Sequence, residues 1–203
     1  MAGLSDRNLA LGVAGLVALW LAMLLLGGPA SVADAALLRA AHLPFLVPAA
    51  RLLTRLGDWS ILLPAASAGA AFLLLRGERR RALLLLGLVL SGRLLVELQK
   101  AGFDRARPDP GGRFVTVHSM AFPSGHAANS MVLWLGLALL AAPPRLRTAA
   151  VPAALFLAGM TGLTRLVLAV HWPSDVIGGW AFGAAWTLAL VRLAGGTSSP
   201  PPH

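Results

Sequence analysis

Long apolar segments limit what this chain can fold into more than any other feature of its sequence. Each segment is long enough to cross the hydrocarbon core of a bilayer, which is about 30 Å thick. Because lipid offers no partner for backbone N–H and C=O groups, a segment that crosses must be helical. The pattern therefore predicts an all-α, polytopic membrane protein with six transmembrane helices, near residues 8–28, 59–75, 82–98, 127–142, 148–168 and 176–194.

The composition agrees with a chain that is surrounded largely by lipid. Of its 203 residues 57% are hydrophobic and 12% are charged, whereas about a quarter of the residues of a soluble domain are charged. The length suits a single domain over residues 1–203. The absence of cysteine excludes disulfides and thiolate metal sites. A net charge of +9 suits anionic lipid headgroups, and we expect the bilayer, and no nucleic acid, as a partner.

Two short basic turns predict how the helices are oriented. Residues 76–81 separate the second and third apolar segments, and residues 143–147 separate the fourth and fifth. Both turns must lie on one membrane face, and their arginines favour the cytoplasmic one. The loops 29–58, 99–126 and 169–175 then lie on the opposite face. Arginines among apolar residues in the first loop predict an amphipathic interfacial helix between the first two spans.

Three polar clusters interrupt the apolar chain, and the six-span topology brings all of them to the same membrane face. The first follows the third span, the second precedes the fourth span, and the third brackets the junction of the last two spans. They are Lys100 with Arg107 and Pro108, the run Pro123-Ser124-Gly125-His126, and Arg165 with His171 and Asp175.

The residue types in these clusters suit a phosphate group. Lys100, Arg107 and Arg165 supply fixed positive charge and several hydrogen-bond donors for phosphoryl oxygens. Ser124 and Gly125 are predicted to stand at a helix N-terminus, where free N–H groups and the helix dipole favour an anion. Glycine also lets the backbone approach a ligand closely.

The remaining polar residues suit acid–base and nucleophilic chemistry. His171 with Asp175 fits a nucleophile whose ring is oriented by a carboxylate, and His126 fits a proton donor to a leaving group. Pro173 is expected to begin the last helix. Asp175 then lies in the first turn of that helix, close enough to fold back on the His171 ring.

These residues carry a resemblance to the type 2 phosphatidic acid phosphatase family. The family signature is K-x6-RP, then PSGH, then SR-x5-H-x3-D. The chain reads Lys100-x6-Arg107-Pro108, Pro123-Ser124-Gly125-His126 and Thr164-Arg165-x5-His171-x3-Asp175. Thr164 replaces the usual serine, which places only a minor phosphate contact in question. The motif-bearing core runs from residue 100 to 175, and the six-span layout extends the resemblance over nearly the whole chain.

The resemblance implies a role for each residue of the motifs. His171 attacks phosphorus and becomes phosphorylated, while Asp175 orients its ring. His126 protonates the departing group and then activates water. No metal and no cofactor are implied. The phosphoryl oxygens are held by Lys100, Arg107, Ser124, Gly125 and Arg165.

Other polar residues have less specific interpretations. Arg105 and Arg113 are interpreted as interfacial anchors that reach for headgroups, and His118 matches no motif position. Arg93 and Glu97 are expected to form an ion pair, either structural or one that steadies Lys100. The dipeptide Asp58-Trp59 is placed near the pocket entrance.

The function expected from the resemblance is metal-independent hydrolysis of a lipid phosphate or pyrophosphate through a phosphohistidine. Polyprenyl pyrophosphate such as undecaprenyl pyrophosphate, phosphatidylglycerophosphate and phosphatidic acid remain open as substrates. The alternative is a lipid phosphotransferase that uses the same phosphohistidine. Haloperoxidase chemistry is disfavoured because relatives of that kind are soluble, and a transporter or scaffold leaves the polar clusters unexplained. The expected location is the bacterial inner membrane, with the site facing the periplasm or cell exterior.

Overall fold

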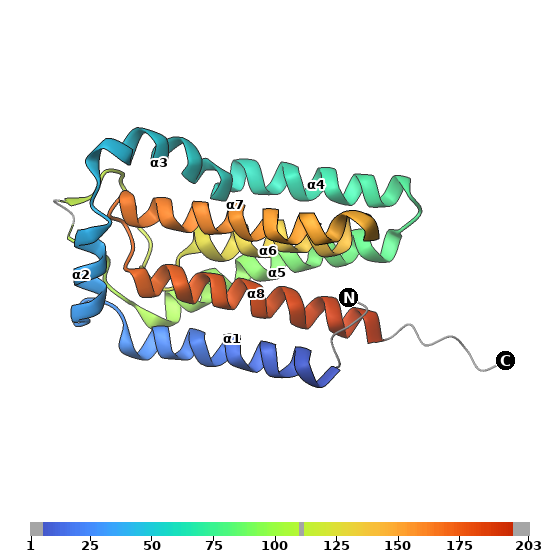
Figure 1. Cartoon of the computed structure of the whole chain (residues 1–203), viewed down its shortest axis with the longest axis horizontal. Helices are drawn as coiled ribbons and strands as arrows, with labels where there is room; N and C mark the ends of the chain where they lie inside the picture. Colours follow the sequence, from blue (N-terminus) through green and yellow to red (C-terminus); the bar gives the residue numbers. More distant parts are fainter. Residues whose placement is uncertain (1–5, 110–111, 197–203) are drawn as a thin grey trace.

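We describe the protein from a computed structural model that covers residues 6–109 and 112–196. Within these ranges every regular element is a helix. The long helices lie side by side in a bundle, with the start of α1 and the end of α8 at the same end of it (Figure 1). They are α1 (Asp6–Leu26), α4 (Trp59–Leu75), α5 (Arg79–Phe103), α6 (Gly125–Leu140), α7 (Arg147–Val167) and α8 (Pro173–Gly196).

These six helices fall where the sequence predicts apolar segments. The bounds of α4 agree with the predicted segment 59–75, and the largest difference is at α5, which was expected to end at residue 98 and continues to Phe103. By length and composition, four of the described helical stretches can cross a membrane: Asp6–Leu26, Arg79–Phe103, Pro144–Val167 and Pro173–Ala194. The helices α4 and α6 are apolar but shorter, with 17 and 16 residues.

The segment between α1 and α4 differs from the prediction. A single interfacial helix was expected, but the chain forms α2 (Val32–Ala40), the 3-10 turn η1 (Pro44–Leu46), α3 (Val47–Leu53) and the 3-10 turn η2 (Thr54–Gly57). The two halves are bent by 66°, and together they are also apolar enough to count as one broken span. Pro44 explains the break after α2, because proline lacks an N–H and restricts the residue before it, and Pro48 stands in the first turn of α3. Figure 1 shows α2 and α3 at one end of the bundle.

Helix α6 is the central element of the bundle. It packs against α5, α7 and α8, while α1 lies against α8 and α4 against α5. Glycines on α8 allow its close approach to α6, because a Cβ at Gly179 would stand 2.8 Å from the carbonyl oxygen of Ser124, and one at Gly183 would stand 2.6 Å from that of Ala128. This contact fixes the start of α8 beside the start of α6.

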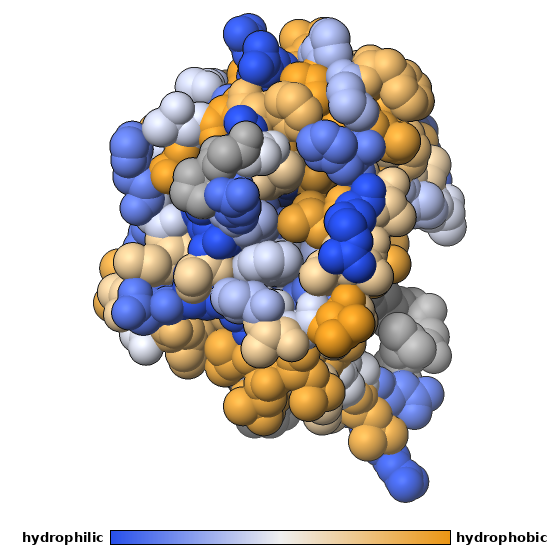
Figure 2. Space-filling model, turned by 90° about the vertical axis from the view of Figure 1, so that its left-hand side faces the viewer, coloured by the Kyte–Doolittle hydropathy of each residue, from blue (hydrophilic) through white to orange (hydrophobic). Residues whose placement is uncertain are grey.

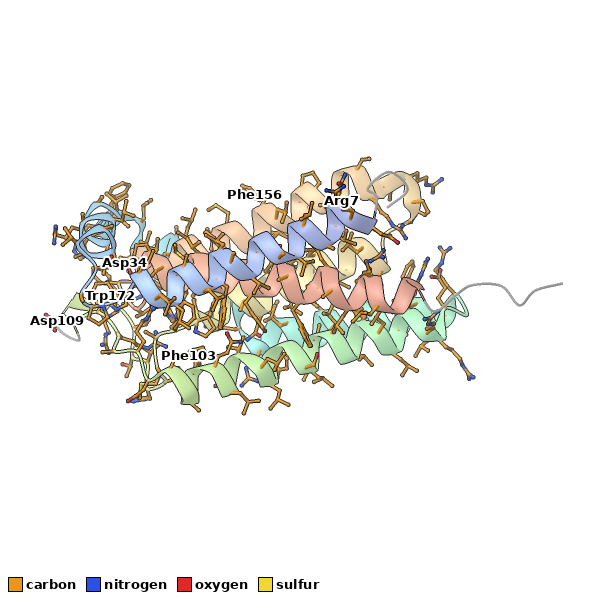
Figure 3. The ribbon with its side chains drawn as sticks, turned by 90° about the horizontal axis from the view of Figure 1, so that it is seen from below. Arg7, Asp34, Phe103, Asp109, Phe156 and Trp172 are labelled. Carbon is orange, nitrogen blue, oxygen red and sulfur yellow. The ribbon has the colours of Figure 1, made fainter. Side chains whose placement is uncertain are left out.

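The outside of the bundle carries large apolar side chains. Leu11, Leu75, Leu83 and Phe156 are 61%, 90%, 70% and 67% exposed, and Figure 3 shows Phe156 on the flank of the bundle. Exposed apolar area on this scale is unusual for a soluble monomer and suits contact with lipid tails.

The two basic connections lie at one end of the bundle, as the predicted topology requires. The basic connections α4–α5 and α6–α7 lie at the end opposite to α2 in Figure 1. Figure 3 shows Arg7 near that same end, and Asp34, Asp109 and Trp172 at the other. The three polar clusters therefore converge at the end that carries α2 and α3.

Candidate active site

A cavity of about 270 Å³ opens at this end of the bundle. Figure 2 views the molecule onto this end, where hydrophilic residues gather across the middle of the face. Six of the eight predicted site residues line the cavity: Lys100, Arg107, Gly125, His126, Arg165 and His171. The other two, Ser124 and Asp175, are fully buried.

His171 lies in the short connection between α7 and α8, and its ring is held by Asp175. Nδ1 of His171 lies 3.3 Å from Oδ2 of Asp175, which also accepts a 2.9 Å hydrogen bond from the backbone N–H of Trp172. Pro173 begins α8 as expected, and this places Asp175 in the first turn. Because both side chains are almost fully buried, the orientation of the imidazole is fixed.

The second ring nitrogen of His171 lies within hydrogen-bond distance of a cation. Nε2 lies 2.9 Å from Nη1 of Arg107. These two contacts favour the tautomer with hydrogen on Nδ1 and a lone pair on Nε2. Burial lowers the pKa of His171 well below its usual value, and the nearby charges of Arg107, Arg165 and Lys100 lower it further. The ring therefore stays neutral, which is the nucleophilic form.

Arg107 is held by the loop that follows α5. Its Nε donates to the Ser119 carbonyl at 2.6 Å, Nη1 donates to the Val170 carbonyl at 2.6 Å, and Nη2 donates to the Ser119 hydroxyl at 3.1 Å. Burial lowers the pKa of Arg107 to about 10, so the group stays charged at neutral pH. Lys100 also donates to the Ser119 hydroxyl, at 3.2 Å, and to the Met120 carbonyl, at 2.9 Å. Ser119 thus accepts hydrogen bonds from two of the three cations, Lys100 and Arg107.

Several polar atoms at the site have no hydrogen-bond partner among the described residues. They are Nε of Arg165, Oγ of Ser124 and Oδ1 of Asn129, all buried. Leaving a buried polar atom unpaired costs about 1–3 kcal/mol. Nε of Arg165, a residue that lines the cavity, is therefore available to a ligand with acceptor oxygens. Arg165 is itself fixed through Nη1, which donates to Oγ1 of Thr54 at 2.8 Å.

The N-terminus of α6 adds to the positive character of the cavity. Ser124 is the N-cap residue and its side chain makes no capping hydrogen bond. A Cβ at Gly125 would lie 3.6 Å from Cε of Lys100 and 3.8 Å from Nδ2 of Asn129. These are ordinary contacts, so the glycine is not required by packing. Its effect is to leave space beside Lys100 at the helix N-terminus.

His126 forms the second histidine–carboxylate pair of the cavity. Its Nε2 lies 2.9 Å from Oδ1 of Asp58, which stands between η2 and α4. This hydrogen bond lowers the pKa of Asp58 below its usual value, so the carboxylate is ionised at neutral pH. The sequence placed Asp58 only near the entrance and gave no indication of this pairing.

Comparison with known proteins agrees with this arrangement. The sequence profile of the PAP2 superfamily matches residues 81–197. The chain belongs to the PAP2 superfamily. The match includes all eight predicted site residues, whereas Asp58 and Thr54 lie outside it.

Individual PAP2 relatives differ in how much of the chain they match. A lipid A 1-phosphatase of Rhizobium johnstonii is 41% identical over 109 residues, which are 49% of this chain and 42% of the relative. The chain therefore spans less than half the length of that protein. Phosphatidylglycerophosphatase B of Bacillus subtilis is 32% identical over 159 residues, which are 74% of this chain and 78% of the relative.

A solved PAP2 structure matches nearly the whole fold. The crystal structure of a transmembrane PAP2 type phosphatidylglycerolphosphate phosphatase from Bacillus subtilis superposes with a TM-score of 0.83 at 28% identity, covering 92% of this chain and 98% of that one. Together with the exposed apolar helices, this identifies the chain as an integral membrane protein.

Arg105 corrects one sequence interpretation. It was expected to be an interfacial anchor, but it is 9% exposed, and its Nη1 donates to Oδ1 of Asp175 at 2.9 Å and to the Ser174 hydroxyl at 3.0 Å. Its guanidinium also stacks on Phe122, 4.4 Å from the ring centroid. The PAP2 motifs do not include this position, and nothing in its spacing separates it from Arg113, which donates to the Pro108 carbonyl.

The remaining polar residues have simpler surroundings. The Thr164 hydroxyl donates to the Thr161 carbonyl at 2.6 Å, so the departure from the PAP2 serine concerns a side chain bonded within its own helix. His118 is exposed. Arg93 and Glu97 form the expected pair, at 3.9 Å, and Arg93 stacks on Trp59 at 4.7 Å. Within the described ranges, no three His, Asp or Glu side chains group as a metal site would need.

Proposed function

We propose that the protein is a lipid phosphatase that works through a phosphohistidine on His171. One observation carries the proposal: the His171 ring is bonded to Asp175 on one side, and its other nitrogen faces a cavity lined by three cations. A neutral imidazole with a fixed tautomer beside an oxyanion-binding cavity suits attack on phosphorus.

The first step transfers the phosphoryl group to the enzyme. Arg107 leaves Nε2 of His171 and turns its Nη1 to a phosphoryl oxygen. The Nε2 lone pair then forms a bond to phosphorus as the bond from phosphorus to the lipid oxygen breaks. Protonated His126 gives its proton to that oxygen, so the leaving group departs as an alcohol, or as a phosphate from a diphosphate.

The second step restores the enzyme. His126, now neutral, takes a proton from water as the water oxygen attacks phosphorus. The N–P bond breaks, inorganic phosphate leaves, and His171 is again neutral. Lys100, Arg107 and Arg165, with the N-terminus of α6, stabilise the charge on the equatorial oxygens in both steps. The chain supplies this positive charge itself, which is consistent with catalysis that needs no metal.

The substrate class follows from the place of the cavity at one end of an apolar bundle. A lipid whose tails lie beside the helices can bring a headgroup phosphate to this level of the membrane. The names of the relatives support lipid phosphates, and phosphatidic acid, phosphatidylglycerophosphate and a polyprenyl pyrophosphate remain the candidates. The proposal includes one domain over 1–203 with its core at 100–175, six spans, and a site facing the periplasm or cell exterior from the bacterial inner membrane.

The test is phosphate release in detergent with EDTA, using these three lipids as the panel. Wild type should release phosphate, His171→Ala should release none, and His118→Ala, a matched exposed histidine from the same face, should behave as wild type. A ³²P-labelled lipid should leave an acid-labile label on wild type only. Full activity in His171→Ala would overturn the assignment of the nucleophile. Label transfer to an added lipid alcohol, with no release of phosphate, would support the phosphotransferase instead.

A further inference from the structure

We propose that Asp58 is a positioning residue for His126, so that the proton donor has its own carboxylate partner, separate from the Asp175–His171 pair. The inference rests on the proposed role of His126 in protonating the leaving group. The observation behind it is geometric: Oδ1 of Asp58 lies 2.9 Å from Nε2 of His126, and the two residues are 68 positions apart in the chain.

The position of Asp58 at a helix terminus gives further evidence that its carboxylate is oriented by His126. Asp58 is the N-cap residue of α4, and aspartate is preferred there because its carboxylate accepts hydrogen bonds from the first free N–H groups of a helix. Its side chain makes no such bond. The carboxylate is turned to His126 instead, so its orientation is explained by the histidine and not by the helix.

The residue before Asp58 holds the same ring from a second side. A Cβ at Gly57 would lie 2.9 Å from Cδ2 and 3.1 Å from Cβ of His126, and 2.5 Å from Cγ2 of Thr161. Only glycine allows the backbone to pass this close to the imidazole. The ring is therefore held between the backbone of Gly57 and the carboxylate of Asp58.

This arrangement determines which nitrogen of His126 exchanges the proton. Nε2–H donates to the carboxylate in both protonation states, so Nδ1 is the nitrogen that carries the mobile proton. A carboxylate at Nε2 also stabilises the imidazolium form.

The charged and titratable groups facing His126 come from four places in the fold. They are Asp58 between η2 and α4, Lys100 of α5, Arg165 of α7, and His171 in the α7–α8 connection. Burial lowers the pKa of His126 below its usual value and the two cations lower it further, whereas the carboxylate of Asp58 raises it. Without Asp58, His126 would lose its proton at a lower pH and would be a weaker acid catalyst near neutrality.

The experiment compares kcat/KM for two substrates with different leaving groups. Dioleoyl phosphatidic acid releases an alkyl alcohol, which needs a proton, whereas 4-nitrophenyl phosphate releases a stable phenolate, which does not. Because kcat/KM counts only the steps up to release of the leaving group, a defect in proton donation affects the lipid alone. The variants are Asp58→Asn, Asp58→Glu and His126→Ala, and Asp104→Asn is the matched control because Asp104 is exposed at the same end of the bundle.

The expected result is that Asp58→Asn loses about 10- to 100-fold in kcat/KM on phosphatidic acid, less than the roughly 100- to 10,000-fold contribution of a general acid because His126 itself is kept, and less than about threefold on 4-nitrophenyl phosphate. The alkaline limb of its pH profile on the lipid should move to lower pH. Asp58→Glu should recover part of the activity, and Asp104→Asn should match wild type. Melting temperatures in detergent show whether each variant is folded.

Three outcomes overturn the inference, and they separate it from the proposed function. Equal losses on both substrates would show that Asp58 is only structural. A leaving-group difference in His126→Ala but none in Asp58→Asn would retain the function and exclude the role of Asp58. No leaving-group difference in His126→Ala would remove the acid role of His126 and this inference with it.

Discussion

Arg105 and Asp175 form a buried ion pair in which Nη1 of the arginine lies 2.9 Å from Oδ1 of the carboxylate, while Oδ2 faces His171. The other terminal nitrogen of Arg105 donates to the carbonyls of Met23 and Leu24, at the end of α1. One guanidinium therefore donates hydrogen bonds to carbonyls in the last turn of α1 and also fixes the carboxylate that contacts the proposed nucleophile.

Replacing Arg105 should damage both stability and activity. Arg105→Met leaves a buried carboxylate without its cation, and removing one partner of a buried pair costs about 3–5 kcal/mol. We expect a lower melting temperature in detergent and a fall in kcat/KM on phosphatidic acid. Arg113→Met is the control, because the hydrogen bonds of Arg113 to the described residues go to the Pro108 carbonyl on the same loop. Equal effects of the two substitutions would contradict a specific role of Arg105.

His171 should remain neutral at a pH where an ordinary histidine is charged. Burial and the cations of the cavity both disfavour the imidazolium, so the pKa lies well below the usual 6.5. Neutral imidazole is the nucleophilic form, and acidification to pH 6.5 should therefore leave the proposed nucleophile unprotonated. The measurement is a ¹⁵N NMR titration of histidine-labelled protein, with the His171 signals assigned by their loss in His171→Gln. A midpoint near 6.5, or a proton on Nε2 in place of Nδ1, would refute this description of the free enzyme.

A methyl group at Gly57 should displace the His126 ring. The new Cβ would stand 2.5 Å from Thr161 and 2.9 Å from the imidazole, so the ring or the backbone must move. A shift of about 1 Å in a catalytic group can cost on the order of 100-fold in rate. We expect Gly57→Ala to lose most of its kcat/KM on phosphatidic acid, and Gly57→Ala/Thr161→Ser to recover part of it. Gly87→Ala, where nothing lies within 4 Å of the added atom, should be harmless.

The unpaired Nε of Arg165 should bind an oxyanion directly. Lysine at this position keeps the charge but has no group equivalent to Nε. A hydrogen bond to a charged group contributes about 1.5–3 kcal/mol. Arg165→Lys should therefore raise the inhibition constant of vanadate by at least about tenfold. Arg113→Lys should leave it unchanged, and an unchanged constant in Arg165→Lys would place the oxyanion elsewhere.

The long helices and the motif residues are predictable from the sequence for a physical reason. An apolar segment of membrane length has few alternatives to a helix, and the motif residues stand at helix ends, where the topology brings them together. The N-cap position of Ser124 and the first-turn position of Asp175 follow from helix-end chemistry alone. The same reasoning places Pro173 at the start of α8.

The supporting contacts are not predictable in this way. The pairs Asp58–His126 and Thr54–Arg165 join residues 68 and 111 positions apart, and a local pattern carries no information about such distances. Arg105 was misplaced for the same reason, since its partner is 70 positions away. Amphipathic character alone predicts one interfacial helix, and it carries no information about where the segment bends.

The contacts that Thr54 and Asp58 make with residues of the cavity have a practical consequence for homology-based work on these proteins. Thr54 and Asp58 contact motif residues from outside the matched range 81–197. A sequence with all three motifs but other side chains at these two positions would still match the family, although the proposed acid catalyst His126 and the proposed phosphate ligand Arg165 would lack these contacts. Hybrids between relatives should therefore exchange residues 54–58 together with α6 and α7.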